Sequence, residues 1–493
     1  MLITMSVFHA LTRITSIIFV KKTVMNSRES YKNKSKDELI DIILDLNEKL
    51  ALLMSTVSEL QQEIQRLKKP KNSRNSSLPP SQDLFRFKNQ SLREKSNKKS
   101  GGQPGHKGET LNMSTEPDYT IKHYPNKKCP VCGQVHDVSE FTEIAGRRQV
   151  IDIPIVKATV TEHLAYRFKC TCGHVNEGSF PSNVSAPVQY GNNISSFIAY
   201  LSARQYVPMS RLSELVHSIT NISISQGTIY NILNRVSDAM LPLYEGIKNN
   251  IYNATTVGGD ETGLKVNNKN YWAWVWQTLQ ETFIVVSENR GYTTVAETFP
   301  DGLPNAIYVS DSLSAQLKIK TKSHQLCLAH ITRELNFFID KYQCSWASDM
   351  KALLKSSMAL KQQMPIDSYS GEHEERSDII EKFADLIKHP LGDNIPKLPA
   401  LQKRLIKHQH HMFNFLFYPD VPFDNNGSER AIRNIKVKQK VSGSFRSDRG
   451  AEIFAIIRSV VDTFIKRGSN PLSEISFAVN LATSKKTFEA QRS

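Results

Sequence analysis

The segment that most constrains the fold runs from residue 254 to about residue 340, where apolar residues recur first with the period of strands. TTVGGD is a short apolar run, YWAWVWQTL alternates large and small apolar residues, and ETFIVVSE follows after one turn. A short helix near 293–299, the strand NAIYVSD and the amphipathic helix CLAHITRELNFFID come next. Period-two runs joined by turns predict antiparallel strands, and the later strand and helix predict an α/β domain.

Three antiparallel strands, a helix, a further strand and a helix are the order of a ribonuclease-H-like α/β fold. Amphipathic helices then interrupt this fold over residues 340–420, and it resumes with NNGSERAIRNIKVKQK and a last helix around Glu452–Arg467. We therefore expect a multidomain α/β protein whose ribonuclease-H-like core, residues 246–480, carries an all-helical insertion. The length of 493 residues agrees, because single cores stop growing well below that size.

Three acidic residues stand at places where such a fold carries chemistry. Asp260 and Asp311 each end a predicted strand, and the carboxyl ends of neighbouring parallel strands share one crevice. Glu429 begins a helix that can pack across that edge; Asp424, five residues earlier, is the alternative third ligand. Carboxylates that converge need a cation, and oxygen ligands suit Mg²⁺ or Mn²⁺. Two such ions about 3.5–4 Å apart would activate the attacking oxygen and stabilise the leaving oxygen of a phosphodiester.

Basic residues supply the complementary charge. The formal net charge is +15, which indicates a polyanionic partner, either nucleic acid or an acidic membrane surface. Arg433 and Lys436 follow Glu429 by one and two helical turns, so both would share its face and contact the DNA backbone. Simple charge balancing on a helix face is the alternative interpretation.

Residues 35–69 carry a heptad repeat in which leucines recur every seven residues, with mostly β-branched residues at the alternate positions. Ser35 and Glu38 form a capping box at its start, and Pro70 lies just past its end. The pattern predicts a leucine-zipper coiled coil of two parallel strands, and therefore a homodimer or larger assembly. A helix that packs on its own domain is the alternative.

The segments on either side of this helix have other characters. Residues 1–34 form an N-terminal extension, and the absence of a cleavage site after its apolar start suggests that translation begins at Met25. Residues 70–118 are rich in Ser, Asn, Gly, Pro and Lys, and from Lys69 to Lys128 basic residues outnumber acidic ones by 13 to 5. This composition predicts a flexible basic linker that binds phosphates or merely joins domains. The apolar start is too short and interrupted to span a bilayer, so we expect a cytoplasmic, nucleoid-associated protein with no membrane contact.

Four of the six cysteines lie in two tight pairs within residues 119–180, which predict a small β-rich zinc-binding module. Cys129 and Cys132, followed by a glycine, have the spacing of a zinc knuckle. Cys170 and Cys172 are one residue closer together, so His174 or His163 is an alternative fourth ligand. We expect one structural Zn²⁺ held by the four cysteines; the alternative is an eroded site that binds no metal.

Residues 181–245 predict a helical DNA-binding domain. Ile194–Gln205, Ser210–Thr220 and Ser225–Met240 are apolar at helical spacing, with short breaks between them. The last two have the pattern of a helix-turn-helix. A pair of helices that only packs is the alternative interpretation.

Several motifs together resemble the transposases of the bacterial insertion-sequence-66 family, and the resemblance extends from about residue 36 to residue 475. The motifs of the core are GGDETGLKV, YWAWVW, VSDSLSAQ, QLCLAHITREL and the long run VPFDNNGSERAIRNIKVKQKVSGSFRSDRGAEIFAIIRSVVDTFIKRG. Upstream of the core stand NSRNSSLPPSQD, GGQPGHKG, CPVCG and YGNNISSFIAYLSARQYVPMSRLSELV.

The resemblance implies a DDE triad, carried here by Asp260, Asp311 and Glu429, and a helical insertion between the second and third acids. Cys327-x-x-His330 resembles a Cys/His pair with a structural or DNA-contacting role in such transposases. The expected reaction is cleavage at the element ends, which frees a 3′-hydroxyl that attacks target DNA. The expected partners are double-stranded DNA and small accessory proteins of the same element. A nuclease or junction resolvase on the same fold, or a catalytically silent DNA-binding remnant, are the rival interpretations.

Overall fold

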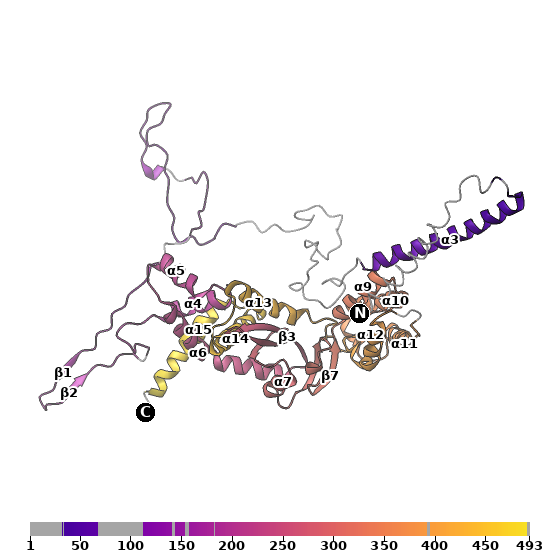
Figure 1. The fold of residues 1–493 in the computed structure, drawn as a ribbon. Helices are drawn as coiled ribbons and strands as arrows, with labels where there is room; N and C mark the ends of the chain where they lie inside the picture. Colours follow the sequence, from indigo (N-terminus) through magenta and orange to yellow (C-terminus); the bar gives the residue numbers. More distant parts are fainter. Residues whose placement is uncertain are drawn as a thin grey trace. The chain divides into compact units, whose positions relative to one another are not determined.

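The structure is a computed structural model that describes residues 32, 34–67, 112–140, 143–152, 157–181, 183–391 and 395–490. The chain divides into two compact units (Figure 1). One unit contains the sheet and comprises Phe87–Ala329, Leu360–Arg376 and His408–Ser493. The other comprises Met1–Arg86, His330–Ala359 and Ser377–Lys407. Most of the basic linker and nearly all of the N-terminal extension lie outside the described residues.

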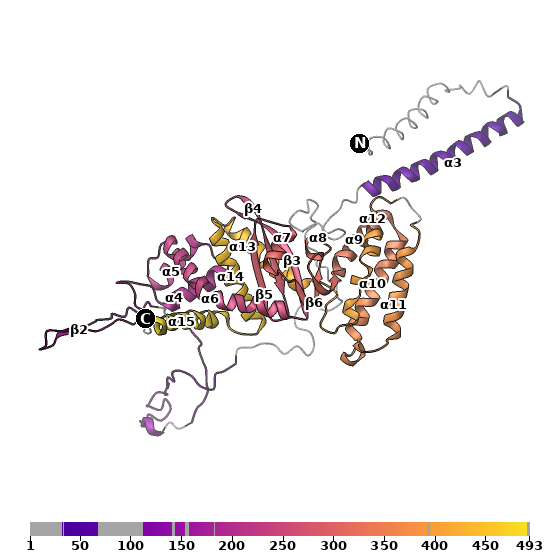
Figure 2. The same cartoon turned by 90° about the horizontal axis from the view of Figure 1, so that it is seen from below.

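A mixed five-stranded sheet forms the centre of the first unit (Figure 2). Its strand order is β5-β4-β3-β6-β7. The first three strands of this sheet, β3, β4 and β5, pair antiparallel in succession, whereas β6 runs parallel to β3 and β7 parallel to β6. The prediction of three antiparallel strands followed by a parallel one is confirmed. The strands are β3 (Thr256–Val266), β4 (Lys269–Gln277), β5 (Thr282–Ser287), β6 (Leu303–Ser310) and β7 (Thr321–Leu326).

Helices cover both faces of this sheet, because the strands bury apolar side chains on both. Trp274 and Trp276 point into a core shared with α6 (Gln226–Asn253), while Ala273 and Val275 point into a core shared with α13 (Asn426–Ser442). The alternation of large and small residues along β4 therefore assigns each kind to one face. Two short helices, α7 (Tyr292–Thr298) and α8 (Ser314–Leu317), lie in the connections around β6.

The outer edge of β5 is covered by α14 (Asp448–Lys466). The backbone N–H of Thr282 donates to the Thr463 hydroxyl at 3.1 Å, and that of Ile284 donates to the Ser459 hydroxyl at 2.9 Å. These bonds satisfy edge groups that would otherwise be free to pair with another chain. The helix predicted around Glu452–Arg467 is confirmed and has a second role as this edge cover.

Three helices precede the sheet, as predicted: α4 (Asn192–Ala203), α5 (Met209–Thr220) and α6. Asn221 ends α5 in the left-handed conformation at φ 57°, and Ser225 caps α6 by accepting the N–H of Thr228. Helix α6 runs on to Asn253, so the expected domain boundary at residue 245 falls inside it. A last helix, α15 (Pro471–Ala490), lies beyond the predicted elements and packs on α4 and α6.

The second unit holds the helical insertion that the sequence predicts over residues 340–420. Its helices are α9 (Leu328–Tyr342), α10 (Ser345–Gln363), α11 (Glu374–Lys388) and α12 (Leu398–Lys407), drawn side by side in Figure 2. The Trp346 indole donates to the carbonyl of Leu386 at 2.9 Å and joins α10 to α11. The last of these helices ends at Lys407, short of the expected residue 420, and gives way to two short 3₁₀ turns, Gln409–His411 and Asn414–Leu416.

The heptad segment forms one helix, α3 (Lys36–Leu67), so the prediction of a helix here is confirmed. Its capping box is present: Glu38 donates its N–H to the Ser35 hydroxyl at 3.2 Å, and Ser35 donates its N–H to the Glu38 carboxylate at 2.8 Å. Most of the heptad side chains that the structure describes are exposed, including Ile43, Leu46 and Leu50. Pairing with a second copy stays a prediction. Among the described helices, none has both the length and the apolar character that crossing a bilayer requires.

The cysteine segment contains much less sheet than expected. Its only strands among the described residues are β1 (Arg167–Lys169) and β2 (Val175–Glu177), which form a short antiparallel hairpin. A single 3₁₀ turn, Val138–Glu140, lies upstream. The side chains of both strands are exposed, so the pairing of the two strands and the turn between them, rather than an apolar core, hold the hairpin.

Candidate active site

Asp260 and Asp311 lie on neighbouring parallel strands. Gly258 of β3 pairs with Val309 of β6, and two residues further along each strand the same register reaches Asp260 and Asp311. Asp311 directly follows β6, as predicted. Asp260 does not end its strand: it lies inside β3, which continues to Val266 because its pairing with β4 extends beyond its pairing with β6. The prediction that Asp260 terminates a strand is therefore wrong, but the expected meeting with Asp311 is retained.

Glu429 approaches the same place from a helix. It lies in the first turn of α13, which packs across β3 and β4. A Cβ atom at Gly258 would lie 2.9 Å from Asn425 and Ser428, so that face of β3 meets the start of α13. Asp260 is two residues from Gly258 and points to the same face. The three predicted acids thus come from β3, the end of β6 and the start of α13.

The electrostatics of Asp260 show that acidic groups gather around it. Burial raises the pKa of Asp260 well above its usual range, and the neighbouring charges of Asp311, Glu261 and Glu429 raise it further. The backbone N–H of Glu261 donates to the Asp260 carboxylate at 2.9 Å and acts in the opposite direction. A carboxyl group in such surroundings resists ionisation unless a positive charge joins it.

The donor set fits a hard divalent cation, because carboxylate oxygens are the ligands that Mg²⁺ and Mn²⁺ take. Among the described residues, no three His, Cys, Asp or Glu side chains stand close enough to hold an ion as they are. Glu429 forms an ion pair with Arg433 at 3.2 Å, one helical turn along α13. Asp311 and Glu429 are charged neighbours of Asp260. Their side chains would have to move for the three carboxylates to contact one ion.

The two basic residues predicted to contact DNA have partners within the protein. Arg433 pairs with Glu429 but keeps 72% of its side chain exposed. Lys436 donates to the backbone carbonyl of Gly263 in β3. Burial, and then the neighbouring charge of Lys440, lower the pKa of Lys436. Lys436 thus helps to hold α13 on the sheet, and Arg433 is the more accessible of the two.

The alternative third ligand, Asp424, is engaged at the start of α13. Its carboxylate accepts the backbone N–H of Asn426 at 3.1 Å and also the Asn426 side-chain amide. These are the bonds of a residue that orders a helix entry. Glu429 is one of the charges that raise the pKa of Asp260.

Glu261 is a member of this site that the sequence did not reveal. Its side chain is 3% exposed, pairs with Arg290 at 3.0 Å and accepts a hydrogen bond from the buried amide of Gln316. Burial and then Asp311 raise the pKa of Glu261, while Arg290 opposes the shift. The available signal was a second acid directly after Asp260 in a strand, a position that seldom stays buried without a partner.

The glycine pair before Asp260 is required by close packing on both faces of β3. At Gly258 the side chains of Gln277, Asn425 and Ser428 leave no room for a Cβ atom, and at Gly259 the Tyr308 hydroxyl fills the place of one. Tyr308 is 1% exposed, so it has no space to withdraw. The two glycines let a helix and an aromatic ring approach the strand just before its first acid.

The two cysteine pairs are built alike, although their spacings differ. Cys129 accepts the N–H of Gly133 on its carbonyl, and Cys170 accepts the N–H of Gly173 in the same way. Both glycines have positive φ, 80° and 87°. Among the described residues no group of three or more ligands joins the pairs, so the four-cysteine zinc site stays a prediction.

Backbone N–H groups in each turn point at the first thiol of the pair. Those of Cys132 and then Val131 lower the pKa of Cys129, and that of Cys172 lowers the pKa of Cys170. Donors aimed at sulfur stabilise the thiolate, the form that binds metal. Each turn therefore favours the thiolate form of its first cysteine.

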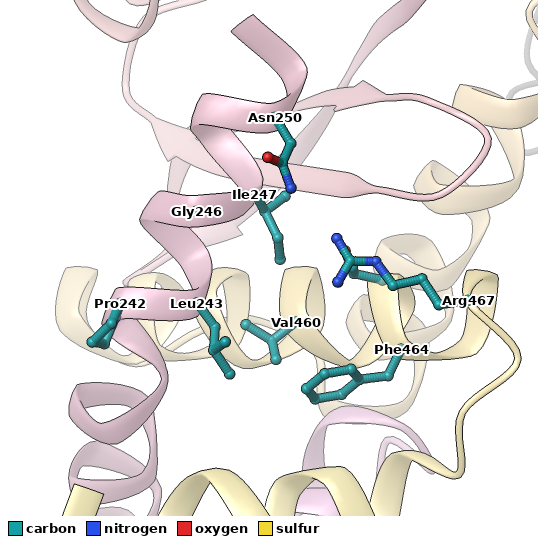
Figure 3. A pocket seen from close by; sticks show the side chains of 9 residues that line it. Pro242, Leu243, Gly246, Ile247, Asn250, Val460, Phe464 and Arg467 are labelled. Carbon is teal, nitrogen blue, oxygen red and sulfur yellow. The ribbon is translucent and has the colours of Figure 1, made fainter. Parts of the chain in front are cut away.

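An apolar pocket lies away from the acids, between α6 and α14 (Figure 3). Leu243, Ile247, Val460 and Phe464 line it, with Arg467 at one side. None of the acids described above is among its lining residues. The acids on β3, at the end of β6 and at the start of α13, rather than this pocket, form the candidate active site.

Comparison with known protein families agrees with this geometry. The family described as Transposase IS66 family matches residues 187–453, more than half of the chain and the part that holds all three predicted acids. A family of unknown function, DUF6444, matches residues 30–112. The comparison with curated proteins gives no match. The sheet, its two strand-borne acids and the third acid on α13 all lie within the matched segment, and the chain belongs to the IS66 family of transposases.

Proposed function

We propose that this transposase cuts DNA at the ends of its insertion sequence and joins them to target DNA, using Asp260, Asp311 and Glu429. The observation that carries the proposal is the gathering of acidic groups around the buried Asp260 of β3: Asp311, Glu261 and Glu429 are its charged neighbours and, together with burial, raise its pKa. A fold that keeps like charges together without a partner is destabilised by them, so their retention points to a bound cation. Metal-dependent phosphodiester chemistry is the reaction that such a site supports.

The strand arrangement supports a ribonuclease-H-like core. Three antiparallel strands and two parallel ones in the order β5-β4-β3-β6-β7 are what that fold requires. The insertion between Asp311 and Glu429 is helical, which agrees with the expectation from the family resemblance. The core would hold the first two acids rigidly on its sheet and bring the third on α13.

Asp260, Asp311 and Glu429 would hold two Mg²⁺ or Mn²⁺ ions. When bound, the ions supply the Lewis acidity that activates the attacking oxygen and stabilises the leaving one. Asp260 and Asp311 would orient the reacting strand from the sheet edge, and Glu429 would turn from Arg433 toward them. Arg433, largely exposed, would then be available to a DNA phosphate.

The other partners are proposals of the same kind. Helices α5 and α6, joined by a turn at Asn221, would contact the duplex as a helix-turn-helix. Helix α3 would pair with a second copy through its exposed heptad residues. Double-stranded DNA in the cytoplasm would be the substrate, both as element ends and as target.

Substitution of the acids tests the proposal. Asp260→Asn, Asp311→Asn and Glu429→Gln keep side-chain shape but remove the charge that holds the ions. Each should lower cleavage of a duplex carrying the inverted repeats that bound the gene by about 10³-fold or more. Binding of the same duplex should be nearly unchanged, because the acids are not the DNA-binding surface. Removing one acid should cost nearly as much as removing all three.

Asp424→Asn is the matched control and should retain measurable cleavage. If Glu429→Gln still cuts while Asp424→Asn does not, the third ligand is Asp424 and the role given to α13 is wrong. Activity in all four variants would refute the metal mechanism. A strand-transfer assay on paired ends separates transposition from the rival nuclease or resolvase, which would cut without joining.

A further inference from the structure

We propose that Asn425 is a positioning residue that sets the three acids relative to one another; this inference rests on the proposed function. Asn425 directly precedes α13 and is 3% exposed. Its contacts reach β3, the end of β6 and α13, the three elements that carry the acids. Two of these contacts reach the residues directly before Asp260 and Glu429. A third reaches the residue before Asp311 through Cys327.

The side-chain amide makes two of the links. Its Nδ2 donates to the carbonyl of Gly259 at 2.7 Å, and its Oδ1 accepts the Ser428 hydroxyl at 2.7 Å. Gly259 immediately precedes Asp260, and Ser428 immediately precedes Glu429. A single amide therefore connects the strand that holds the first acid to the helix turn that holds the third.

The backbone of Asn425 makes further links. Its N–H donates to the Sγ atom of Cys327 at 3.2 Å, and the N–H of Cys327 donates to the carbonyl of Ser310 at 2.8 Å. Ser310 immediately precedes Asp311. The carbonyl of Asn425 accepts the N–H of Glu429 itself at 3.1 Å. All three acids are thus reached from one residue through buried bonds.

The side chain is not used as an ordinary helix cap. Asn425 stands at the N-cap position of α13, where an asparagine usually accepts an N–H from the next turn of its own helix. In α13 no such bond is made. The amide spans to β3 instead, and the absence of a Cβ atom at Gly258 gives its oxygen room, since such an atom would lie 2.9 Å from it.

Asparagine is the residue that this position needs, because a donor and an acceptor on one short side chain serve the two links at once. Alanine makes neither link and leaves the buried Gly259 carbonyl without this donor. The start of α13 would then be free to shift against β3, and Glu429 with it. Substitution of a residue that orients a metal ligand typically lowers metal affinity or activity by about 10–100-fold.

The test measures metal binding directly, with Mn²⁺ as the probe and its electron paramagnetic resonance signal as the readout. In the full chain, Asn425→Ala should raise the apparent dissociation constant for Mn²⁺ by about 10-fold or more. Ser428→Ala removes only the link to α13 and should raise it less, about threefold. Asn426→Ala is the matched control: this neighbouring asparagine is exposed and bonds only to Asp424 in the contacts described above. It should bind Mn²⁺ like the parent.

A second readout separates positioning from folding. Unfolding temperature is measured for each variant, and binding is compared well below the lowest of them. A merely structural role would lower the unfolding temperature of Asn425→Ala yet leave its Mn²⁺ constant and the metal concentration for half-maximal cleavage unchanged. Positioning requires both metal quantities to shift together, with Ser428→Ala between the parent and Asn425→Ala.

The outcomes distinguish this inference from the proposed function. Asp260→Asn is titrated in parallel. If Asp260→Asn loses Mn²⁺ binding but Asn425→Ala binds like the parent, the inference about Asn425 is wrong and the proposed function stands. If Asp260→Asn binds Mn²⁺ like the parent, the acids are not the metal site and both fail.

Discussion

The three acids and the two cysteine pairs are the two regions where metal ligands are predicted, yet they are built in opposite ways. Asp260, Asp311 and Glu429 stand on three separate elements that buried bonds hold together. Each cysteine pair stands on a single turn, with Cys132 and Cys172 exposed. A turn can be encoded by a few adjacent residues, whereas the meeting of three elements requires a packed core.

The pKa shifts of the two regions also run in opposite directions. Burial and like charges raise the pKa of Asp260, so the fold disfavours its charged form. Backbone N–H groups lower the pKa of Cys129 and Cys170, so their turns favour thiolates. Local hydrogen bonds therefore favour the charged form of each first cysteine, whereas burial and like charges disfavour the charged form of Asp260; a cation bound as proposed would relieve that repulsion.

The largest effect is expected from breaking the packing beneath the acids. Gly259→Ala would place a Cβ atom in the space of the Tyr308 hydroxyl, and Tyr308 is fully enclosed. Overpacking of this kind should cost about 2–3 kcal/mol of unfolding free energy, measured by urea denaturation. Cleavage should fall as well, because the displaced backbone directly precedes Asp260.

Gly263→Ala in the same strand is the matched control. A Cβ atom there would meet nothing within 4 Å, and the residue is exposed. Replacing that glycine should be neutral or stabilise by up to about 1 kcal/mol through the unfolded chain. Equal destabilisation by both substitutions would show that the tight contact with Tyr308 is not what fixes the strand.

The sheet shows what a sequence pattern conveys and what it hides. The alternation of Trp272, Trp274 and Trp276 predicts β4 because period two needs only local residues. Strand β7 could not be predicted in this way because its buried positions carry polar side chains, His324 and Gln325. The Gln325 amide is satisfied by the carbonyl of Met412 and by the N–H of Phe415, far along the chain, and no local pattern announces such partners.

The candidate site divides in the same way. Asp311 and Glu429 could be named because a strand end and a helix start are visible in the sequence, and Asp260, which lies inside its strand, because a family motif marks it. Glu261 and Asn425 could not, since their importance lies in contacts with Arg290, Gln316, Gly259 and Ser428 from other elements. The role given to Lys436 is also changed by a tertiary bond, to the carbonyl of Gly263.

A smaller effect is expected from removing the charge of Asp260 without metal. Asp260→Asn, although expected to be inactive, should raise the unfolding temperature in chelator at pH 7, because the folded protein disfavours the ionised carboxylate that the unfolded chain adopts and asparagine has no such form. The gain should be on the order of 1 kcal/mol, or about 2–4 °C for a domain of this size.

The pH dependence of that gain follows from linkage. The folded-state pKa of Asp260 is raised above its unfolded value of about 3.9, so the stability it contributes is fully present below that pH. It is lost as pH rises through the raised pKa. The difference in unfolding temperature between Asp260→Asn and the parent should therefore be near zero at about pH 4 and grow toward neutral pH. Added Mg²⁺ should reduce this difference in unfolding temperature. A gain that shrinks with rising pH would contradict the assigned cause.

The smallest effect on the sheet unit is expected from the cysteine pairs. Zinc held by four cysteines should be present at about one ion per chain in protein purified without chelator, and Cys129→Ser with Cys132→Ser should remove it. The unfolding temperature of the unit that contains the sheet should stay the same in this double variant, because the strands beside Cys170 and Cys172 bury no side chain in a core.

Cys327→Ser and Cys344→Ser are the controls and should retain the zinc. Zinc kept by the double variant would remove the assignment. Zinc lost together with a large fall in the unfolding temperature would mean that the cysteine turns, like the acids, depend on the packed core.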